Sequence, residues 1–149
     1  MKKVLFVCTG NTCRSPMAQV LADDIFDRGG LGLKAYSCGV FALKGSPASV
    51  YAVEVMEDFG LELAGHGATP VQQEAVEDAA VIITMTHGHK SHILQLFPQF
   101  AHKTHTLTEI CGDDGEGDIT DPFGANKGFY RQCAEQIKSN LEKIDWEKF

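Results

Sequence analysis

Apolar residues recur along the chain in two patterns: short continuous runs, and longer stretches with helical spacing. The runs are typical of strands covered on both faces of a sheet. The longer stretches predict helices with one buried face, because their apolar residues recur every three or four positions. Strands are expected at Lys3–Val7, Lys34–Cys38, Ala80–Met85 and His105–Leu107. Helices are expected at Pro16–Gly29, Pro47–Phe59, Thr69–Asp78, Ser91–Phe97 and Gly124–Ile144.

Strands and helices alternate, and the connections between them are short. This order predicts an α/β fold with a parallel sheet and right-handed crossovers. No internal repeat or linker interrupts it, so residues 1–149 are expected to form one domain. Sites in such sheets lie at the carboxyl ends of the strands, and Cys8 directly follows the first strand.

Composition narrows the function classes. The chain has 149 residues, of which 44% are hydrophobic, and a net charge of −7. The charge argues against nonspecific binding of nucleic acid or of acidic membranes, and no apolar run approaches a membrane span. The first strand begins at once, which leaves no room for a signal peptide and predicts a cytoplasmic protein. The odd number of cysteines (five) favours thiols over a disulfide framework. We expect a monomer without a cofactor.

The strand-to-helix turn at residues 8–16 holds the strongest chemical signal, the sequence Cys-Thr-Gly-Asn-Thr-Cys-Arg-Ser-Pro. Cys8 lies six residues before Arg14. Backbone N–H groups of such a loop can surround an anion, and a guanidinium fork suits two phosphoryl oxygens. Gly10 is expected to take a conformation closed to other residues, and Ser15 to cap the helix that Pro16 opens.

The same features bear on the Cys8 thiol. A helix N-terminus and a nearby cation lower a cysteine pKa, so Cys8 is expected to be largely a thiolate at neutral pH, with a stabilising hydrogen bond from Ser15. A lone Cys-x5-Arg occurs by chance, and buried cysteines are usually structural. The preceding strand, the internal glycine and the Ser-Pro helix start favour a functional loop. A P-loop nucleotide site is excluded, because no Gly-Lys-Ser/Thr is present.

Taken with Asp121-Pro122-Phe123-Gly124 near the other end, this loop resembles that of the low-molecular-weight protein tyrosine phosphatase family. The resemblance extends over essentially the whole chain. It implies a four-stranded parallel sheet flanked by helices on both faces, and catalysis without a metal on phosphorylated protein substrates. It also implies that Cys8 attacks phosphorus to form a cysteinyl phosphate and that Asp121 acts as general acid and base. Arg14 and the loop N–H groups would bind phosphate, with contributions from Thr9, Gly10, Asn11, Thr12, Cys13 and Ser15.

Further roles follow from the resemblance. Asn11, Ser15, Ser37 and His66 match a set of residues that braces the loop by hydrogen bonds, and asparagine suits a left-handed position. Cys13 would form a disulfide with Cys8 that protects the nucleophile from irreversible oxidation. The alternative is that Cys13 only packs under the loop.

The substrate is predicted from three positions. Thr12 stands where tyrosine-specific members commonly carry isoleucine, and threonine there resembles the bacterial protein-arginine phosphatase branch, as does Phe41. A hydroxyl suits a guanidinium better than a phenyl ring, and the faces of Phe41 and Phe123 could stack on that guanidinium. A neutral substitution at Thr12 within a tyrosine phosphatase remains the alternative.

Other functions fit the sequence less well. An arsenate reductase relays oxidation through a further close cysteine pair, whereas Cys111 and Cys133 are 22 residues apart, so both are expected to be structural. A binding module built on a dead phosphatase would usually have lost one of the three catalytic residues. The histidines at 87, 89 and 92 fit no metal-ligand spacing, and the acidic segment 113–118 fails the EF-hand pattern. No metal site is predicted.

Overall fold

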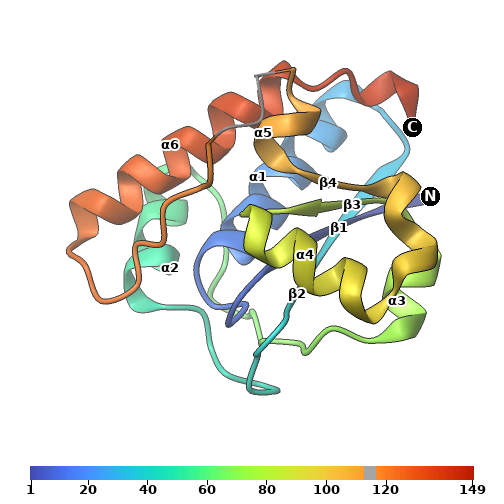
Figure 1. Ribbon diagram of the computed structural model, residues 1–149. Helices are drawn as coiled ribbons and strands as arrows, with labels where there is room; N and C mark the ends of the chain where they lie inside the picture. The colour runs from blue at the N-terminus through green and yellow to red at the C-terminus, as the bar shows by residue number, and fades with distance from the viewer. Residues whose placement is uncertain (113–116) are drawn as a thin grey trace.

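A computed structural model of the protein describes residues 1–112 and 117–149. Its sheet has four strands in the order β2–β1–β3–β4, and every neighbouring pair is parallel (Figure 1). The strands are β1 (Lys2–Cys8), β2 (Leu33–Gly39), β3 (Ala79–Thr84) and β4 (Thr104–Thr106). The predicted α/β class and parallel sheet are confirmed.

Helices cover both faces of the sheet, as Figure 1 shows. They are α1 (Arg14–Gly29), α2 (Val50–Asp58), α3 (Gln73–Asp78), α4 (His87–Leu96), α5 (Leu107–Ile110) and α6 (Lys127–Lys143), with 3-10 turns η1 (Pro98–Lys103) and η2 (Trp146–Lys148). Among the described residues, no helix is both long enough and apolar enough to cross a bilayer.

Successive side chains of β1 point to opposite faces of the sheet, where two hydrophobic clusters lie. Val4, Phe6 and Cys8 point into the larger cluster, which includes residues of α1, α2 and α6. Leu5 and Val7 point into a smaller cluster with α3 and α4. Since successive strand residues face opposite sides, β1 is buried throughout its apolar run, and Cys8 ends on the side of α1.

Several predicted boundaries are wrong, and side-chain caps explain two of them. The second helix begins at Val50, three residues after the predicted Pro47, and Ser49 precedes it. Thr86 accepts a hydrogen bond from the N–H of His89 and so starts α4 four residues before the predicted Ser91. Asn126 caps α6, which therefore begins at Lys127 and not at Gly124. The predicted helix from Thr69 is helical only over Gln73–Asp78.

Trp146 closes the core from outside α6, in the short turn η2. Its indole N–H donates to the carbonyl of Leu141, and its ring meets Phe26 edge-on with centroids 4.8 Å apart. Trp146 is thus a packing anchor, and it lies in a turn that the apolar pattern did not predict.

Candidate active site

The loop between β1 and α1 lies at the carboxyl edge of the sheet (Figure 1). Cys8 is the last residue of β1, and α1 begins at Arg14. The first-turn N–H groups of α1 are therefore at the loop, where a helix offers its positive end to an anion. Cys13, not Ser15, is the N-cap residue, and no side chain caps the helix. The predicted capping role of Ser15 is wrong, because Ser15 already lies inside the helix.

Asn11 gives the loop its shape. Its φ of 57° is the one positive φ among the non-glycine residues that the structure describes, which suits asparagine, a residue tolerant of the left-handed region. Gly10 is not among the glycines with positive φ, so its predicted conformational role is wrong. The backbone turn that was assigned to Gly10 is made one residue later.

Hydrogen bonds from Asn11 and Ser15 converge beside the nucleophile. The Sγ of Cys8 lies 2.8 Å from the Oγ of Ser15, and the Nδ2 of Asn11 donates to the same oxygen at 2.8 Å. Because Ser15 accepts from Asn11, its own hydrogen is left to donate. The sulfur is the nearer acceptor, since the carbonyl of Cys38 lies 3.4 Å away.

The remaining bonds of Asn11 tie the loop to the rest of the domain. Its Nδ2 also donates to the Oγ of Ser37 at 2.9 Å, and its Oδ1 accepts from the N–H of Thr69 at 2.9 Å. The Nε2 of His66 lies 2.7 Å from the Asn11 carbonyl, and Ser37 in turn donates to Gln19. The structure thus brings together all four residues that the sequence grouped as a brace.

Competing effects act on the Cys8 thiol. Burial raises the pKa of Cys8, while the Ser15 hydroxyl, the backbone N–H groups of Ser15 and Asn11, and the charge of Arg14 each lower it. Burial has the largest effect, and the net direction is upward. The expectation of a lowered pKa is wrong in direction, since the sequence could not show how deeply the strand end is buried. Ser15 is the strongest of the groups that favour the thiolate.

Arg14 is buried, with 5% of its surface exposed, and its guanidinium has fixed partners. Nη1 donates to the carbonyl of Ile119 at 3.0 Å, and Nη2 donates to the Oγ1 of Thr9 at 3.5 Å. Nη2 also lies 3.5 Å from a carboxylate oxygen of Asp121. The cysteine loop and the Asp-Pro segment, which are far apart in the sequence, therefore meet through Arg14.

A pocket of about 210 Å³ opens above Cys8. Its lining is Cys8, Thr9, Gly10, Thr12, Cys13, Arg14, Asp121 and Phe123. Phe123 stands at the rim, and 73% of its surface is exposed. Phe41 is not among the described lining residues, and its ring instead meets that of His92 edge-on with centroids 5.1 Å apart. A nucleophile, a guanidinium and a carboxylate thus face one small cavity.

Cys13 has its own polar contacts. Its Sγ lies 3.0 Å from the Oγ of Ser49 and 3.5 Å from the Oη of Tyr130. Both cysteines of the loop are free thiols, so their disulfide remains a prediction. Burial, followed by the contact with Cys13, raises the pKa of Tyr130 to about 12, so that this phenol stays neutral.

Sequence reasoning missed several residues that shape the site. At Gly39, a Cβ would come within 2.4 Å of the Thr9 carbonyl oxygen and 2.9 Å of the Asn11 nitrogen. Only glycine permits this close approach of β2 to the loop. Ser49, Tyr130 and His89 also contact the loop. An isolated serine, tyrosine or histidine gives no sequence signal of such a contact.

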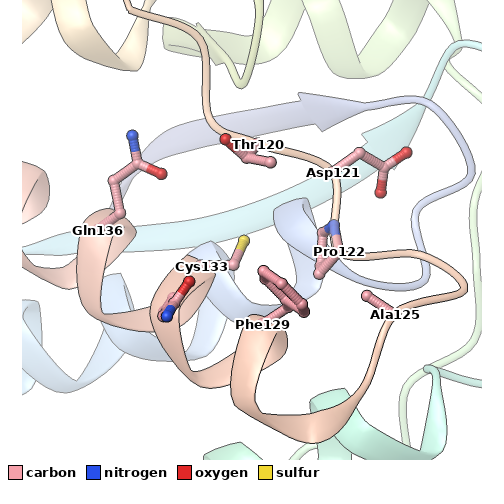
Figure 2. A pocket seen from close by; sticks show the side chains of 8 residues that line it. Thr120, Asp121, Pro122, Ala125, Phe129, Cys133 and Gln136 are labelled. Atoms are coloured by element: carbon pink, nitrogen blue, oxygen red, sulfur yellow. The ribbon is translucent and has the colours of Figure 1, made fainter.

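A second pocket of about 470 Å³ is lined in part by Asp121 and Pro122 (Figure 2). Phe129 and Cys133 project into this region from α6. Burial raises the pKa of Cys133 to about 12, which makes it a poor nucleophile and supports its structural role. Within residues 1–112 and 117–149, no group of three His, Cys, Asp or Glu side chains is arranged to hold a metal ion. Most of the acidic segment, residues 113–116, lies outside the described part of the chain.

Comparison with known proteins identifies the family. The model for low molecular weight phosphotyrosine protein phosphatase matches residues 3–147. The chain belongs to this family. It is therefore a phosphoprotein phosphatase, a hydrolase, and the predicted family and fold are confirmed.

Three relatives of this phosphatase are informative. The protein-arginine-phosphatase of Geobacillus stearothermophilus is 40% identical over 143 residues, covering 95% of this chain and 93% of the relative. The tyrosine phosphatase PtpB of Staphylococcus epidermidis is 33% identical over 146 residues, covering 95% and 96%. A solved YwlE arginine phosphatase, a cysteine-to-serine mutant with a phosphorylated active-site serine, is 37% identical with a TM-score of 0.91, covering 95% and 91%.

Proposed function

We propose that the protein hydrolyses phosphoarginine in proteins through a phosphate ester of Cys8 sulfur. The observation that carries the proposal is the position of Thr12 on the wall of the pocket above Cys8. There it replaces part of an apolar wall with a hydroxyl, which can accept a hydrogen bond from a guanidinium but offers little to a phenyl ring. The similarity to protein-arginine phosphatases over most of the chain supports the same substrate.

In the first step, the Cys8 thiolate attacks phosphorus and the P–N bond breaks. The electron pair of that bond stays on the guanidine nitrogen, which takes the proton of the Asp121 carboxyl group. Arg14 and the N–H groups of the loop stabilise the charge on the phosphoryl oxygens, an effect that grows in the transition state. Asp121, at 3.5 Å from Arg14, is placed at the edge of the same pocket.

In the second step, water attacks phosphorus and passes a proton to Asp121. The electron pair of the S–P bond returns to Cys8, and inorganic phosphate leaves. The mechanism needs the thiolate, which burial disfavours and Ser15 favours. Nucleophile and acid/base thereby return to their starting states without a metal or cofactor.

Phosphate release from a phosphoarginine peptide tests the proposal. Wild type should release phosphate, Cys8→Ser should not, and Asp121→Asn should be slower by about 10²–10⁴-fold. Tyrosine phosphatase activity is the second candidate, favoured by the similarity to PtpB. Equal or lower efficiency on phosphoarginine than on a matched phosphotyrosine peptide would favour that candidate instead.

A further inference from the structure

His89 of α4 reaches the catalytic loop from the opposite layer of the domain. Its side chain is buried, with 6% of the residue surface exposed. Its Nε2 lies 2.8 Å from the Oγ1 of Thr9, the residue that directly follows the nucleophile. Thr86 accepts a hydrogen bond from the N–H of His89 at 3.1 Å. The imidazole is therefore carried by the capped first turn of a helix.

Thr9 connects His89 to the guanidinium. Its Oγ1 accepts from the Nη2 of Arg14 at 3.5 Å, which uses one acceptor position of the hydroxyl. A hydroxyl has one hydrogen and a second lone pair, and these remain for His89. Whichever of the two donates, the bond with His89 fixes the rotation of the Thr9 side chain. The oxygen that faces Arg14 is thereby held in place.

The buried position of His89 is energetically unfavourable, which suggests that the residue has a functional role. The Nδ1 of His89 is buried and has no hydrogen-bond partner among the residues that the structure describes. A buried unsatisfied nitrogen costs free energy and is uncommon in native proteins. Burial and, after it, the charge of Arg14 lower the pKa of His89 to about 4. A neutral imidazole contacts Thr9 without adding a second positive charge beside Arg14.

We propose that His89 is a positioning residue that, through the Thr9 hydroxyl, holds the Arg14 guanidinium in the orientation in which it binds phosphoryl oxygens. The inference rests on the phosphate-binding role proposed for Arg14. It does not depend on whether the substrate is phosphoarginine or phosphotyrosine. His89 is not among the residues that line the pocket above Cys8, whereas Thr9, which it contacts, lines that pocket.

Hydrolysis of p-nitrophenyl phosphate and inhibition by vanadate test the inference. The variants are His89→Leu, His89→Gln, Thr9→Val and the double variant His89→Leu/Thr9→Val. Glutamine can place an amide near the position of Nε2, whereas leucine cannot form a hydrogen bond. His105→Leu is the control, since His105 is a partly buried histidine whose charged neighbours are Lys90 and Glu109 rather than Arg14. Thermal unfolding of each variant reports its stability separately.

His89→Leu should lower kcat about three- to tenfold and weaken vanadate inhibition by a similar factor, as expected for one hydrogen bond. His89→Gln should recover most of this loss, and His105→Leu should behave as wild type. Thr9→Val should lose about as much as His89→Leu, and the double variant no more than either, because both act on one contact.

If the loss of kcat in the double variant equalled the product of the two single losses, the inference would be overturned. It would also be overturned if His89→Leu had the same kcat and the same vanadate inhibition as wild type. Failure of glutamine to restore activity in a variant that is as stable as wild type would also count against it. If wild type shows no phosphatase activity that depends on Cys8, the proposed function fails and the inference fails with it. An active wild type with an unaffected His89→Leu refutes the inference alone.

Discussion

The sulfur of Cys8 lies 2.8 Å from the hydroxyl oxygen of Ser15, inside the first turn of α1. Asn11 donates to that oxygen from the other side. The hydroxyl is thereby oriented toward the sulfur, where a hydrogen bond stabilises negative charge. It opposes the burial that raises the pKa of Cys8.

Ser15→Ala should therefore raise the pKa of Cys8 further above its ordinary value. Less thiolate is then present at neutral pH, and kcat/KM at pH 7 should fall about tenfold or more, the range for a hydrogen bond to a charged group. The pH dependence of iodoacetamide alkylation measures the thiolate directly, with Ser91→Ala on the exposed part of α4 as control. An alkylation profile in Ser15→Ala that coincides with that of wild type would contradict this role.

Gly39→Ala should damage the loop although it touches no substrate. The added Cβ would lie 2.4 Å from the Thr9 carbonyl oxygen, so β2 and the loop must separate. Overpacking of this kind typically costs about 1–3 kcal/mol, and kcat should fall with stability. Thermal unfolding and turnover measure the two effects. Gly65→Ala is the matched control, because a Cβ there meets open space; similar behaviour of the two variants would argue against the steric explanation.

Peroxide should inactivate wild type reversibly. Oxidation of the Cys8 thiolate gives a sulfenic acid, which the Cys13 thiol can attack, releasing water and forming a disulfide that a dithiol reduces. Cys13→Ala lacks the second thiol, so its Cys8 should proceed to irreversible oxidation. Activity recovered after peroxide and then dithiothreitol measures the difference. Recovery of Cys13→Ala to the extent of wild type would show that Cys13 only packs beneath the loop.

His89 should make folding stability depend on pH in the acid range. Its pKa is lowered to about 4 in the folded protein, whereas an unfolded histidine titrates near 6.5. Between these values the unfolded chain binds more protons, so stability falls as the pH drops from about 6.5 to about 4. His89→Leu should remove this component, on the order of 2 kcal/mol, from urea unfolding measured at several pH values. Parallel pH curves for wild type and variant would contradict a buried neutral His89.

The sequence predicted the sheet and the loop well, because both depend on local pattern. The apolar run of β1 and the helix after Arg14 are readable in the order of residues. The pairing of Cys8 with Asp121 followed from the family resemblance and not from local pattern. The direction of the Cys8 pKa shift was not readable, since burial is set by helices that arrive from distant parts of the chain. Gly39 and His89 approach Thr9 from 30 and 80 residues further along the chain, and no spacing rule links them to the loop.

The predicted boundaries failed where a cap outweighed the apolar pattern. Thr86 and Asn126 each accept a hydrogen bond from a backbone N–H three residues later. Pro47, the predicted start of the second helix, lies beside an apolar stretch but outside the helix, which begins at Val50. The expected contact of Phe41 with the substrate was also beyond what the sequence could show. An exposed aromatic side chain on a loop can pack against a neighbour such as His92 instead.

The ratio of kcat/KM for a phosphoarginine peptide to that for a phosphotyrosine peptide of the same sequence tests the central claim most directly. Thr12→Val removes the hydroxyl and keeps the shape of the side chain, and Thr12→Ile removes the hydroxyl and adds apolar bulk. We expect a ratio above one in wild type that falls at least about tenfold in both variants, because a polar contact to the substrate is lost. A ratio at or below one that neither substitution changes would contradict this expectation.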